Sequence, residues 1–207
     1  MSSPNKTLLP FFCLLVFLAF EVRAQETATI AFVNALPTPA SSDFKYRGQS
    51  IRPNPFARGD ISTSFQVPAG SFEFEVVDSS LGTAKLNLDL SPGVHSTAVV
   101  YLEEIKKNGS EEILRTIRVL TVPGSQRPGF RILSAGIATP ISLLADGQPV
   151  QLNPSSLSKA VGGDLSLTLT YPATSQEWPV SVEQKGPYLV VLFPDPDGKF
   201  QMTLISE

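Results

Sequence analysis

The chain has 207 residues and a formal net charge of −3, with 16 Lys and Arg against 19 Asp and Glu. No basic stripe is present to hold phosphates, which disfavours nucleic acid binding. The single His and the single Cys are too few for a zinc site or a disulfide framework. Composition therefore predicts no metal and no cofactor.

Residues 1–24 are typical of a secretory signal peptide. Lys6 gives a positive start, residues 8–20 form an almost unbroken apolar run, and Ala24 ends a plausible cleavage site. The run is shorter than the roughly 20 residues that span a bilayer, so we expect no stable membrane span after cleavage. Cleavage removes Cys13 and takes the formal charge to −4. An exported chain without cysteine suggests a secreted or periplasmic bacterial protein.

The first strands follow the signal peptide. We expect them at residues 29–35, 43–46, 61–77, 85–90, 96–102 and 112–120. Within residues 59–75, Phe65 and Val67 alternate with polar neighbours, and Phe72 and Phe74 do so again after residues 68–70, Pro-Ala-Gly. Alternation on both sides of Pro and Gly predicts a β-hairpin. Residues 96–102 are apolar on both faces, which indicates a strand buried on two sides.

A Pro-rich stretch at residues 122–128 is expected to link two modules. Beyond it, the N-terminal pattern returns about 100 residues later. The matched landmarks are residues 30–35 with 130–135, 38–39 with 139–140, 47–49 with 146–148, 54–55 with 153–154, and 59–62 with 163–166, together with Pro68-Ala69 and Pro172-Ala173. Preserved order marks repeated modules.

The sequence therefore predicts an all-β protein in which two tandem Ig-like or transthyretin-like β-sandwich modules follow a cleavable signal peptide. The expected boundaries are 1–24 for the signal peptide, 25–121 for the first module, 122–128 for the linker and 129–207 for the second module. Further strands are expected at residues 165–171, 178–183, 187–193 and 200–205, with Asp197-Gly198 as the last turn.

Two short motifs resemble a bacterial exported domain of unknown function, the 4397 family. They are Ala28-x-Ile30-x-Phe32-x-Asn34-Ala35-x-Pro37 and the turn Val67-Pro68-Ala69-Gly70-Ser71-Phe72. Thr174 and the later position of Pro140 depart from the pattern in the second copy. The resemblance implies tandem sandwich-like modules and a role in the cell envelope, and it supplies no catalytic residues.

Candidate chemistry is sparse. A Ser/His/Asp triad would need His95, which lies at a turn, and no Gly-x-Ser-x-Gly elbow is present. Residues 195–198, Asp-Pro-Asp-Gly, resemble the start of a calcium loop but fit a hairpin turn better. The pairs Glu103-Glu104 and Glu111-Glu112 are expected to flank a surface turn at residues 106–109. Asn108 begins a formal glycosylation sequon. We expect no catalytic residue and no enzyme activity.

Aromatic residues are the remaining candidates for ligand contact. Tyr46, Trp178 and Tyr188 could form a sugar-stacking platform, although Trp178 matches Phe74 of the first copy and so fits a core role. The strands at 96–102 and 187–193 could instead bury an interface between modules or with a partner. We expect a non-enzymatic envelope module that binds an envelope protein, or acts as a structural spacer between envelope proteins, through sheet edges and through the Pro-rich loops at 36–42 and 52–58. The alternative is a carbohydrate-binding or enzyme-accessory domain with a polysaccharide partner.

Overall fold

The computed structural model describes residues 26–106, 113–163 and 165–207. Within these ranges the protein is all-β, and fifteen strands form four sheets with no helix. No helix long and apolar enough to cross a membrane occurs in the described residues. The predicted signal peptide at 1–24, the turn at 107–109 with its sequon at Asn108, and the pair Glu111-Glu112 lie outside the described residues.

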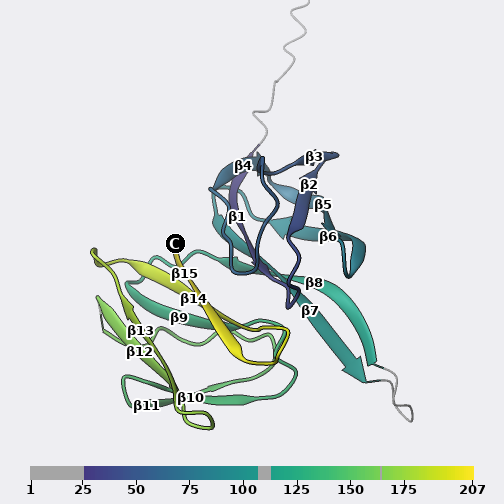
Figure 1. Cartoon of the computed structure of the whole chain (residues 1–207). Helices are drawn as coiled ribbons and strands as arrows, with labels where there is room; N and C mark the ends of the chain where they lie inside the picture. The colour runs from purple at the N-terminus through teal and green to yellow at the C-terminus, as the bar shows by residue number, and fades with distance from the viewer. Residues whose placement is uncertain (1–25, 107–112, 164) are drawn as a thin grey trace, which may run out of the picture.

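The first eight strands make up the N-terminal half, shown in purple to teal in Figure 1. They are β1 (Thr27–Ala35), β2 (Ser42–Tyr46), β3 (Gln49–Ser50), β4 (Phe65–Pro68), β5 (Gly70–Asp78), β6 (Gly82–Leu90), β7 (His95–Lys106) and β8 (Ile113–Pro123). Two sheets result, one ordered β4-β1-β7-β8 and the other ordered β3-β2-β5-β6. Their facing side chains form one apolar core that includes Phe32, Phe44, Phe74 and Val100.

The remaining strands make up the C-terminal half, shown in green to yellow in Figure 1. They are β9 (Gly129–Ser134), β10 (Ile141–Ala145), β11 (Gln148–Leu152), β12 (Ser166–Tyr171), β13 (Gln176–Ser181), β14 (Pro187–Pro194) and β15 (Phe200–Ser206). They form the sheets β15-β14-β9 and β11-β10-β12-β13. A second core with Phe130, Ile132, Leu169 and Val190 fills the space between them.

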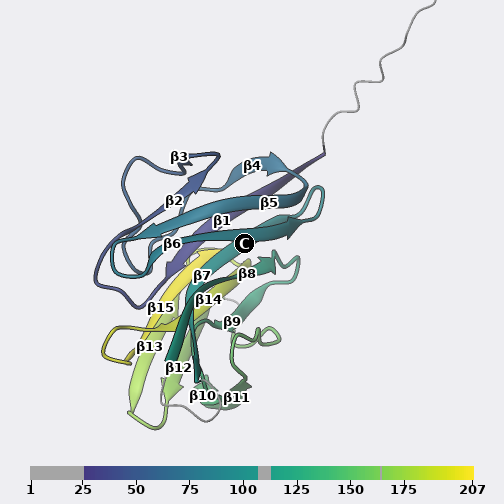
Figure 2. The same ribbon diagram turned by 90° about the vertical axis from the view of Figure 1, so that its right-hand side faces the viewer.

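A third core joins the halves. Val33, Val99 and Tyr101 pack there against Leu133, Leu189, Val191 and Phe193. The sheets β4-β1-β7-β8 and β15-β14-β9 therefore each pack against two neighbours, and the four sheets stack as successive layers. Figure 2 shows the N-terminal half above the C-terminal half in this stack.

This stacking explains the strands with two apolar faces. Along β7, Ala98 and Val100 belong to the first core, whereas Val99 and Tyr101 belong to the third. β1 and β7 run parallel, as do β9 and β14, and parallel pairs are normally covered on both faces. The expectation that residues 96–102 are buried on two sides is confirmed, and the partner of that second face is the C-terminal half of the same chain.

The hairpin predicted at residues 61–77 is wrong. β4 pairs with β1, whereas β5 pairs with β2 and β6, so the chain leaves one sheet at Pro68 and enters the other at Gly70. Gly70 does adopt the expected positive φ, at 101°. Local turn chemistry specified the change of direction correctly, but it carries no information about which strand each flank will join.

The two halves share a pattern of strand pairing, but the match predicted at residues 59–62 is wrong. Ser62 exchanges hydrogen bonds with the backbone of Phe32, and Ser158 exchanges the same bonds with Ile132. Ser62 therefore corresponds to Ser158 and not to Ser166. By the same pairing, Leu169 lies opposite Trp178 as Phe74 lies opposite Leu86, so Trp178 corresponds to Leu86 rather than to Phe74.

Other turns agree with expectation. Arg47-Gly48 has φ values of 50° and 78°, and Asp146-Gly147 has 48° and 79°, so both close two-residue hairpins with positive φ at each position. Asp197-Gly198 lies in the turn between β14 and β15. β8 continues to Pro123, and residues 124–128 connect it to β9.

Candidate interaction site

The two longest strands of the described chain extend beyond the stacked sheets. β1 ends at Ala35, which lies opposite Tyr101, while β7 continues to Lys106 and stays paired with β8. We call residues 102–106 and 113–117 the β7–β8 ribbon. Figure 1 shows it projecting away from both halves. Sheet pairing on the β1 side of β7 is therefore absent beyond Tyr101 among the described residues, which leaves an open edge.

The chain itself moves away from this edge after β1. The side-chain carbonyl of Asn34 accepts a hydrogen bond from the Leu36 amide at 3.1 Å, and Pro37 and Pro39 follow in a loop. Proline has no amide hydrogen to give to a neighbouring strand. No strand of the described chain therefore lies beside residues 102–106 of β7 on the side where β1 would have continued. We call this position the vacant lane.

A buried carboxylate holds that loop in place. Asp78 is 2% exposed and accepts hydrogen bonds from the hydroxyls of Thr38 and Ser42 and from the amides of Ser80 and Leu81. Burial alone would raise the pKa of Asp78, but these hydrogen bonds outweigh it and hold the pKa below its ordinary value. These hydrogen bonds fasten the loop to the end of β5.

Hydrogen bonds at the start of β7 show which backbone groups face the lane. The Val94 carbonyl accepts from Thr29 of β1, and the His95 carbonyl accepts from Gly124, beyond the end of β8. The backbone N–H and C=O groups of successive residues point to opposite sides of a strand. In β7, those of even-numbered residues therefore point towards β1 and those of odd-numbered residues towards β8. The carbonyl of Leu102 and both backbone groups of Glu104 therefore face the vacant lane.

Gly136 of the C-terminal half lies against the inner end of the lane, next to the Leu102 carbonyl. A Cβ atom there would lie 3.0 Å from the Leu102 carbonyl oxygen, and its φ is 67°. Glycine is thus required by both the close approach and the backbone conformation. This contact places the C-terminal half against the root of the β7–β8 ribbon.

Two open cavities follow the lane. One, of about 530 Å³, is lined by Pro37, Pro39, Leu81, Arg115 and Pro194, among others. The second, of about 280 Å³, is lined by Tyr101, Ile105, Ile137, Ala138 and Pro154, among others. Both include Leu102, Glu104 and Gly136. The side chains of Leu102 and Arg115 lie on the face of the first core, and those of Tyr101 and Ile105 on the face of the third. The cavities therefore lie on opposite faces of the lane.

The ribbon also exposes apolar side chains. Ile113 and Leu114 are 52% and 56% exposed, and Ile105 is exposed beside them. Two ion pairs cross the ribbon, Glu104 with Arg115 and Glu103 with Arg118, each at 2.9 Å. Glu103 and Glu104 thus belong to β7, and most of the turn that they were expected to flank lies outside the described residues. The ribbon thus combines exposed apolar side chains with charged ones beside an edge of β7 that has no strand partner.

The aromatic residues predicted to contact a ligand pack against two different cores. Tyr46 stacks on Phe72 of the first core with ring centroids 4.5 Å apart. Trp178 is partly buried against the second core. Tyr188 stacks on Phe130 in that same core, and its hydroxyl donates to the Gln184 carbonyl at 2.6 Å. The structure does not gather the three on one surface.

His95 has one hydroxyl beside it. Ser64 Oγ lies 3.1 Å from His95 Nε2 in an exposed position. A catalytic triad would also need an acid that orients the imidazole, and none of the hydrogen bonds or ion pairs given for the described residues links an acid to this ring. Within the described chain, no group of three or more His, Cys, Asp or Glu could hold a metal ion.

The Asp-Pro-Asp-Gly segment is a hairpin turn, as expected. Asp195 Oδ1 accepts hydrogen bonds from the amides of Asp197 and Lys199, each at 2.9 Å. Burial acts to raise the pKa of Asp195, but these amides and Gln201 lower it further than burial raises it. Both oxygens of this carboxylate are engaged within the turn, which borders the larger cavity.

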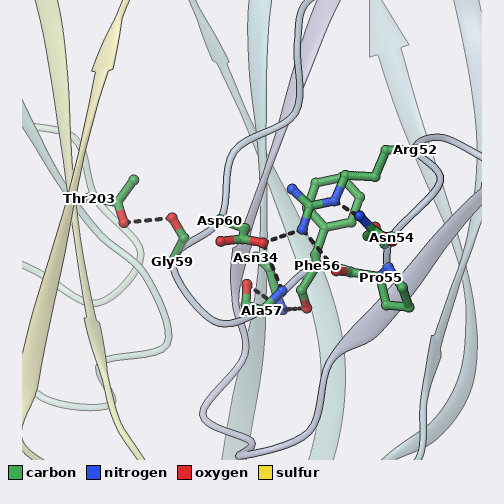
Figure 3. A network of polar contacts seen from close by, with 9 residues as sticks. All are labelled: Asn34, Arg52, Asn54, Pro55, Phe56, Ala57, Gly59, Asp60 and Thr203. Atoms are coloured by element: carbon green, nitrogen blue, oxygen red, sulfur yellow. Dashed lines mark hydrogen bonds and ion pairs between the residues drawn. The ribbon is translucent and has the colours of Figure 1, made fainter.

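The second Pro-rich loop, at residues 52–58, is fastened inward, as Figure 3 shows. Arg52 donates to the carbonyls of Asn54 and Pro55, pairs with Asp60 and lies 4.0 Å over the Phe56 ring. Nearby, Thr203 of β15 donates to the Gly59 carbonyl at 2.9 Å. Of the two loops predicted to bind a partner, only the one at 36–42 lines the vacant lane.

Sequence reasoning missed the open edge itself. Residues 103–106 continue β7, whereas the predicted strand ended at 102. A usable signal was present: Ile105, Ile113 and Leu114 extend the apolar pattern beyond the length that the strand at 29–35 could pair. A mismatch in the lengths of neighbouring strands therefore indicates an unpaired edge.

Compared with known proteins, the chain matches no protein-family model and no curated protein sequence. The resemblance to the exported 4397 family accordingly stays a prediction from two short motifs.

Proposed function

We propose that this chain is an exported, non-enzymatic protein of a bacterial cell envelope, built from two β-sandwich modules, that binds a partner protein through the β7–β8 ribbon. Export rests on the signal-like segment at residues 1–24. The two-module plan is supported by the repeated pairing, in which a parallel central pair and an outer sheet occur in each half.

The observation that carries this proposal is the ribbon. Strand edges and exposed apolar residues are aggregation hazards when they have no partner, and here the ribbon carries both: β1 leaves one edge of β7 open, and Ile113 and Leu114 are exposed on β8, one strand away from that edge. The stacked sheets fix the direction in which the ribbon points, because the third core joins both halves. A fixed and projecting edge suits contact with another protein.

The carbohydrate-binding alternative depends on Tyr46, Trp178 and Tyr188. Each of them packs against a core, and the first belongs to a different core from the other two. Sugar recognition by stacking needs exposed ring faces on one surface. We therefore keep protein contact as the function that the geometry supports best.

Site-specific photo-crosslinking tests the proposal. A photoreactive residue is placed at Leu114 on the ribbon, or at Leu165, which is 48% exposed but lies just before β12 in the C-terminal half. In the native envelope, we expect a discrete crosslinked protein from position 114 and none from position 165. No crosslinked species at 114, or the same species at both positions, would contradict a ribbon-specific partner.

A further inference from the structure

We propose that the vacant lane beside residues 102–106 receives an extended segment of the partner as an added β-strand, and that this segment alternates apolar and basic side chains. The inference deepens the proposed function and rests on it, because it names the binding mode and the chemistry of the partner. The occupant is a strand of another protein, and a second copy of this chain is one outcome of the test.

Backbone complementarity gives the first reason. Both backbone groups of Glu104 face the lane without a strand of the described chain beside them, whereas Gly136 lies against the Leu102 carbonyl at the inner end of the lane. Strand addition satisfies such groups through main-chain hydrogen bonds. Residues 102–106 span about 13–17 Å at roughly 3.3 Å per residue, so a segment of about five residues matches the open edge.

The cavities give the second reason. Successive side chains of a strand point to opposite faces, and the two cavities lie on opposite faces of the lane. A strand placed there would direct alternate side chains into the cavity beside Ile105, Ile137 and Ala138 and into the cavity beside Pro37, Pro39 and Arg115. The open edge can pair with the backbone of an added strand, and the two cavities can receive its side chains, which point alternately to the two faces.

Charge selects the polar side chains of that strand. Among the described residues, the carboxylates that line the two cavities come from Glu103, Glu104 and Asp195, and the cationic lining comes from Arg115. Arg118 reaches Glu103 from β8, outside the lining. Lys or Arg on the incoming strand would complement the excess negative charge, and an acidic strand would be repelled.

Two proline variants of the mature full-length chain test which edge binds. Glu104 lies opposite Arg115, and since the Glu104 backbone faces the lane, the Arg115 backbone faces the free edge of β8. Glu104→Pro and Arg115→Pro each remove one outward amide and the same ion pair, and neither removes a β7–β8 hydrogen bond. Proline is tolerated in strands at such edge positions. Thermal unfolding confirms that both variants are folded.

The probe is a seven-residue peptide that alternates Val and Lys, with blocked ends, and binding is followed by amide chemical shifts. We expect shifts at residues 102–106 and affinity that falls at least about tenfold when alternate peptide amides are N-methylated or when Glu104 is Pro. Arg115→Pro removes a cation from the cavity lining but no backbone group that faces the lane, so it should not weaken binding of the Lys peptide, and a Val and Glu peptide should bind at least about tenfold more weakly.

Several results would overturn the proposal. Equal binding of the N-methylated peptide would exclude strand addition, and a larger loss in Arg115→Pro than in Glu104→Pro would assign binding to β8. A dimer in sedimentation that Glu104→Pro abolishes would assign the lane to a second copy. If crosslinking at Leu114 succeeds and survives Glu104→Pro, the protein-binding role stands and only strand addition fails.

Discussion

The two halves of the molecule share a pattern of strand pairing, except that β4 has no counterpart in the second half, and they differ again where the candidate site lies. β7 and β8 have 12 and 11 residues, whereas their counterparts β14 and β15 have 8 and 7. In the C-terminal half, Pro194 ends the hairpin close to the sheet. The part of β7 and β8 that matches β14 and β15 in length belongs to the stacked sheets. The additional residues of β7 and β8 create an open edge that the C-terminal half lacks.

A second difference concerns the hairpins that follow the first strand of each half. Tyr46 and Ala145 occupy corresponding positions before the two-residue turns. The Tyr46 ring stacks on Phe72, whereas Ala145 lines an open cavity of about 380 Å³ with Val150 and Val161. Where the first half has the large side chain of Tyr46, the second half has the small side chain of Ala145. The cavity in the second half thus lies at a position that the Tyr46 ring fills in the first half.

The largest expected effect concerns the core that joins the halves. Phe193 is fully buried in the third core and Phe130 in the second. Phe193→Ala and Phe130→Ala should each lower the free energy of unfolding by about 3–5 kcal/mol, but only Phe193→Ala should also weaken amide exchange protection in β1 and β7. Hydrogen exchange on both variants measures this. Protection lost only in β9–β15 would show that the halves are energetically independent.

An ion pair present only in the C-terminal half gives the next prediction. Arg131 pairs with Glu207 and donates to the Pro123 carbonyl, and the side chains of Arg131 and Glu207 are 16% and 1% exposed. The corresponding position in β1 is Ala31. Glu207→Ala should cost about 3 kcal/mol, because it leaves a largely buried guanidinium with one partner fewer.

Urea unfolding measures that cost, with an exposed ion pair as the control. Arg115→Ala breaks the pair with Glu104 on the ribbon surface, and we expect a loss below about 1 kcal/mol because solvent screens exposed charges. Equal losses from Glu207→Ala and Arg115→Ala would mean that burial of the C-terminal pair adds nothing to stability.

The sequence was a good guide to which residues form strands and a poor guide to which strands pair. Alternation at Leu86, Leu88 and Leu90 predicted β6 correctly, because one buried face leaves a period-two pattern. The Pro-Ala-Gly turn after Val67 predicted a hairpin, and the chain instead changes sheets there. Pairing depends on contacts distant in sequence, which local patterns do not encode.

The candidate site was less predictable than the fold. An open edge is defined by where neighbouring strands end. The end of β1 at Ala35 leaves an open edge only because Ala35 pairs with Tyr101 and β7 continues beyond that residue. The buried position of Asp78 was also hidden, because an acid followed by Ser79-Ser80 is typical of an exposed turn. Its partners, Thr38 and Ser42, come from a loop about 40 residues earlier.

Asp78 is a buried acid of the N-terminal half that is held by hydroxyl and amide groups, whereas the buried side chain of Glu207 in the C-terminal half pairs with Arg131. The hydrogen bonds of Asp78 predict a loop that is sensitive to acid. Since its folded pKa is lowered, the carboxylate contributes stability that is complete above its unfolded pKa of about 3.9 and is lost as pH falls through the folded pKa. Asp78→Asn should cost about 2 kcal/mol at pH 7 and should remove this part of the acid dependence.

Urea unfolding at pH 7 and at a series of values below 4 measures both effects. Asp195→Asn is the control, because the pKa of Asp195 is also lowered but its carboxylate is exposed in a hairpin turn. Asp78→Asn should lose less stability than the parent protein as the pH falls below 4. Parallel stability curves for the parent and Asp78→Asn would contradict a stabilising charged form of Asp78.

The smallest expected effect tests the corrected register of the repeat. Ser62 and Ser158 each accept a hydrogen bond at 2.8 Å, from the amides of Phe32 and Ile132 respectively. Replacement by Ala leaves that amide without its partner, and the penalty for an unsatisfied donor grows with burial. Ser62 is buried and Ser158 is partly exposed, so we expect Ser62→Ala to cost about 1–2 kcal/mol and Ser158→Ala about 1 kcal/mol.

The matched control is Ser166→Ala, at the position that sequence comparison alone had aligned with Ser62. Ser166 is exposed at the start of β12, and exposed substitutions away from special features usually stay within about 0.5 kcal/mol. Denaturant midpoints for the three variants should therefore fall in the order Ser62→Ala, Ser158→Ala, Ser166→Ala, with the first the least stable. If Ser166→Ala is as damaging as Ser62→Ala while Ser158→Ala is neutral, the two hydroxyls that bond β1 and β9 are not equivalent supports of the duplicated sheets.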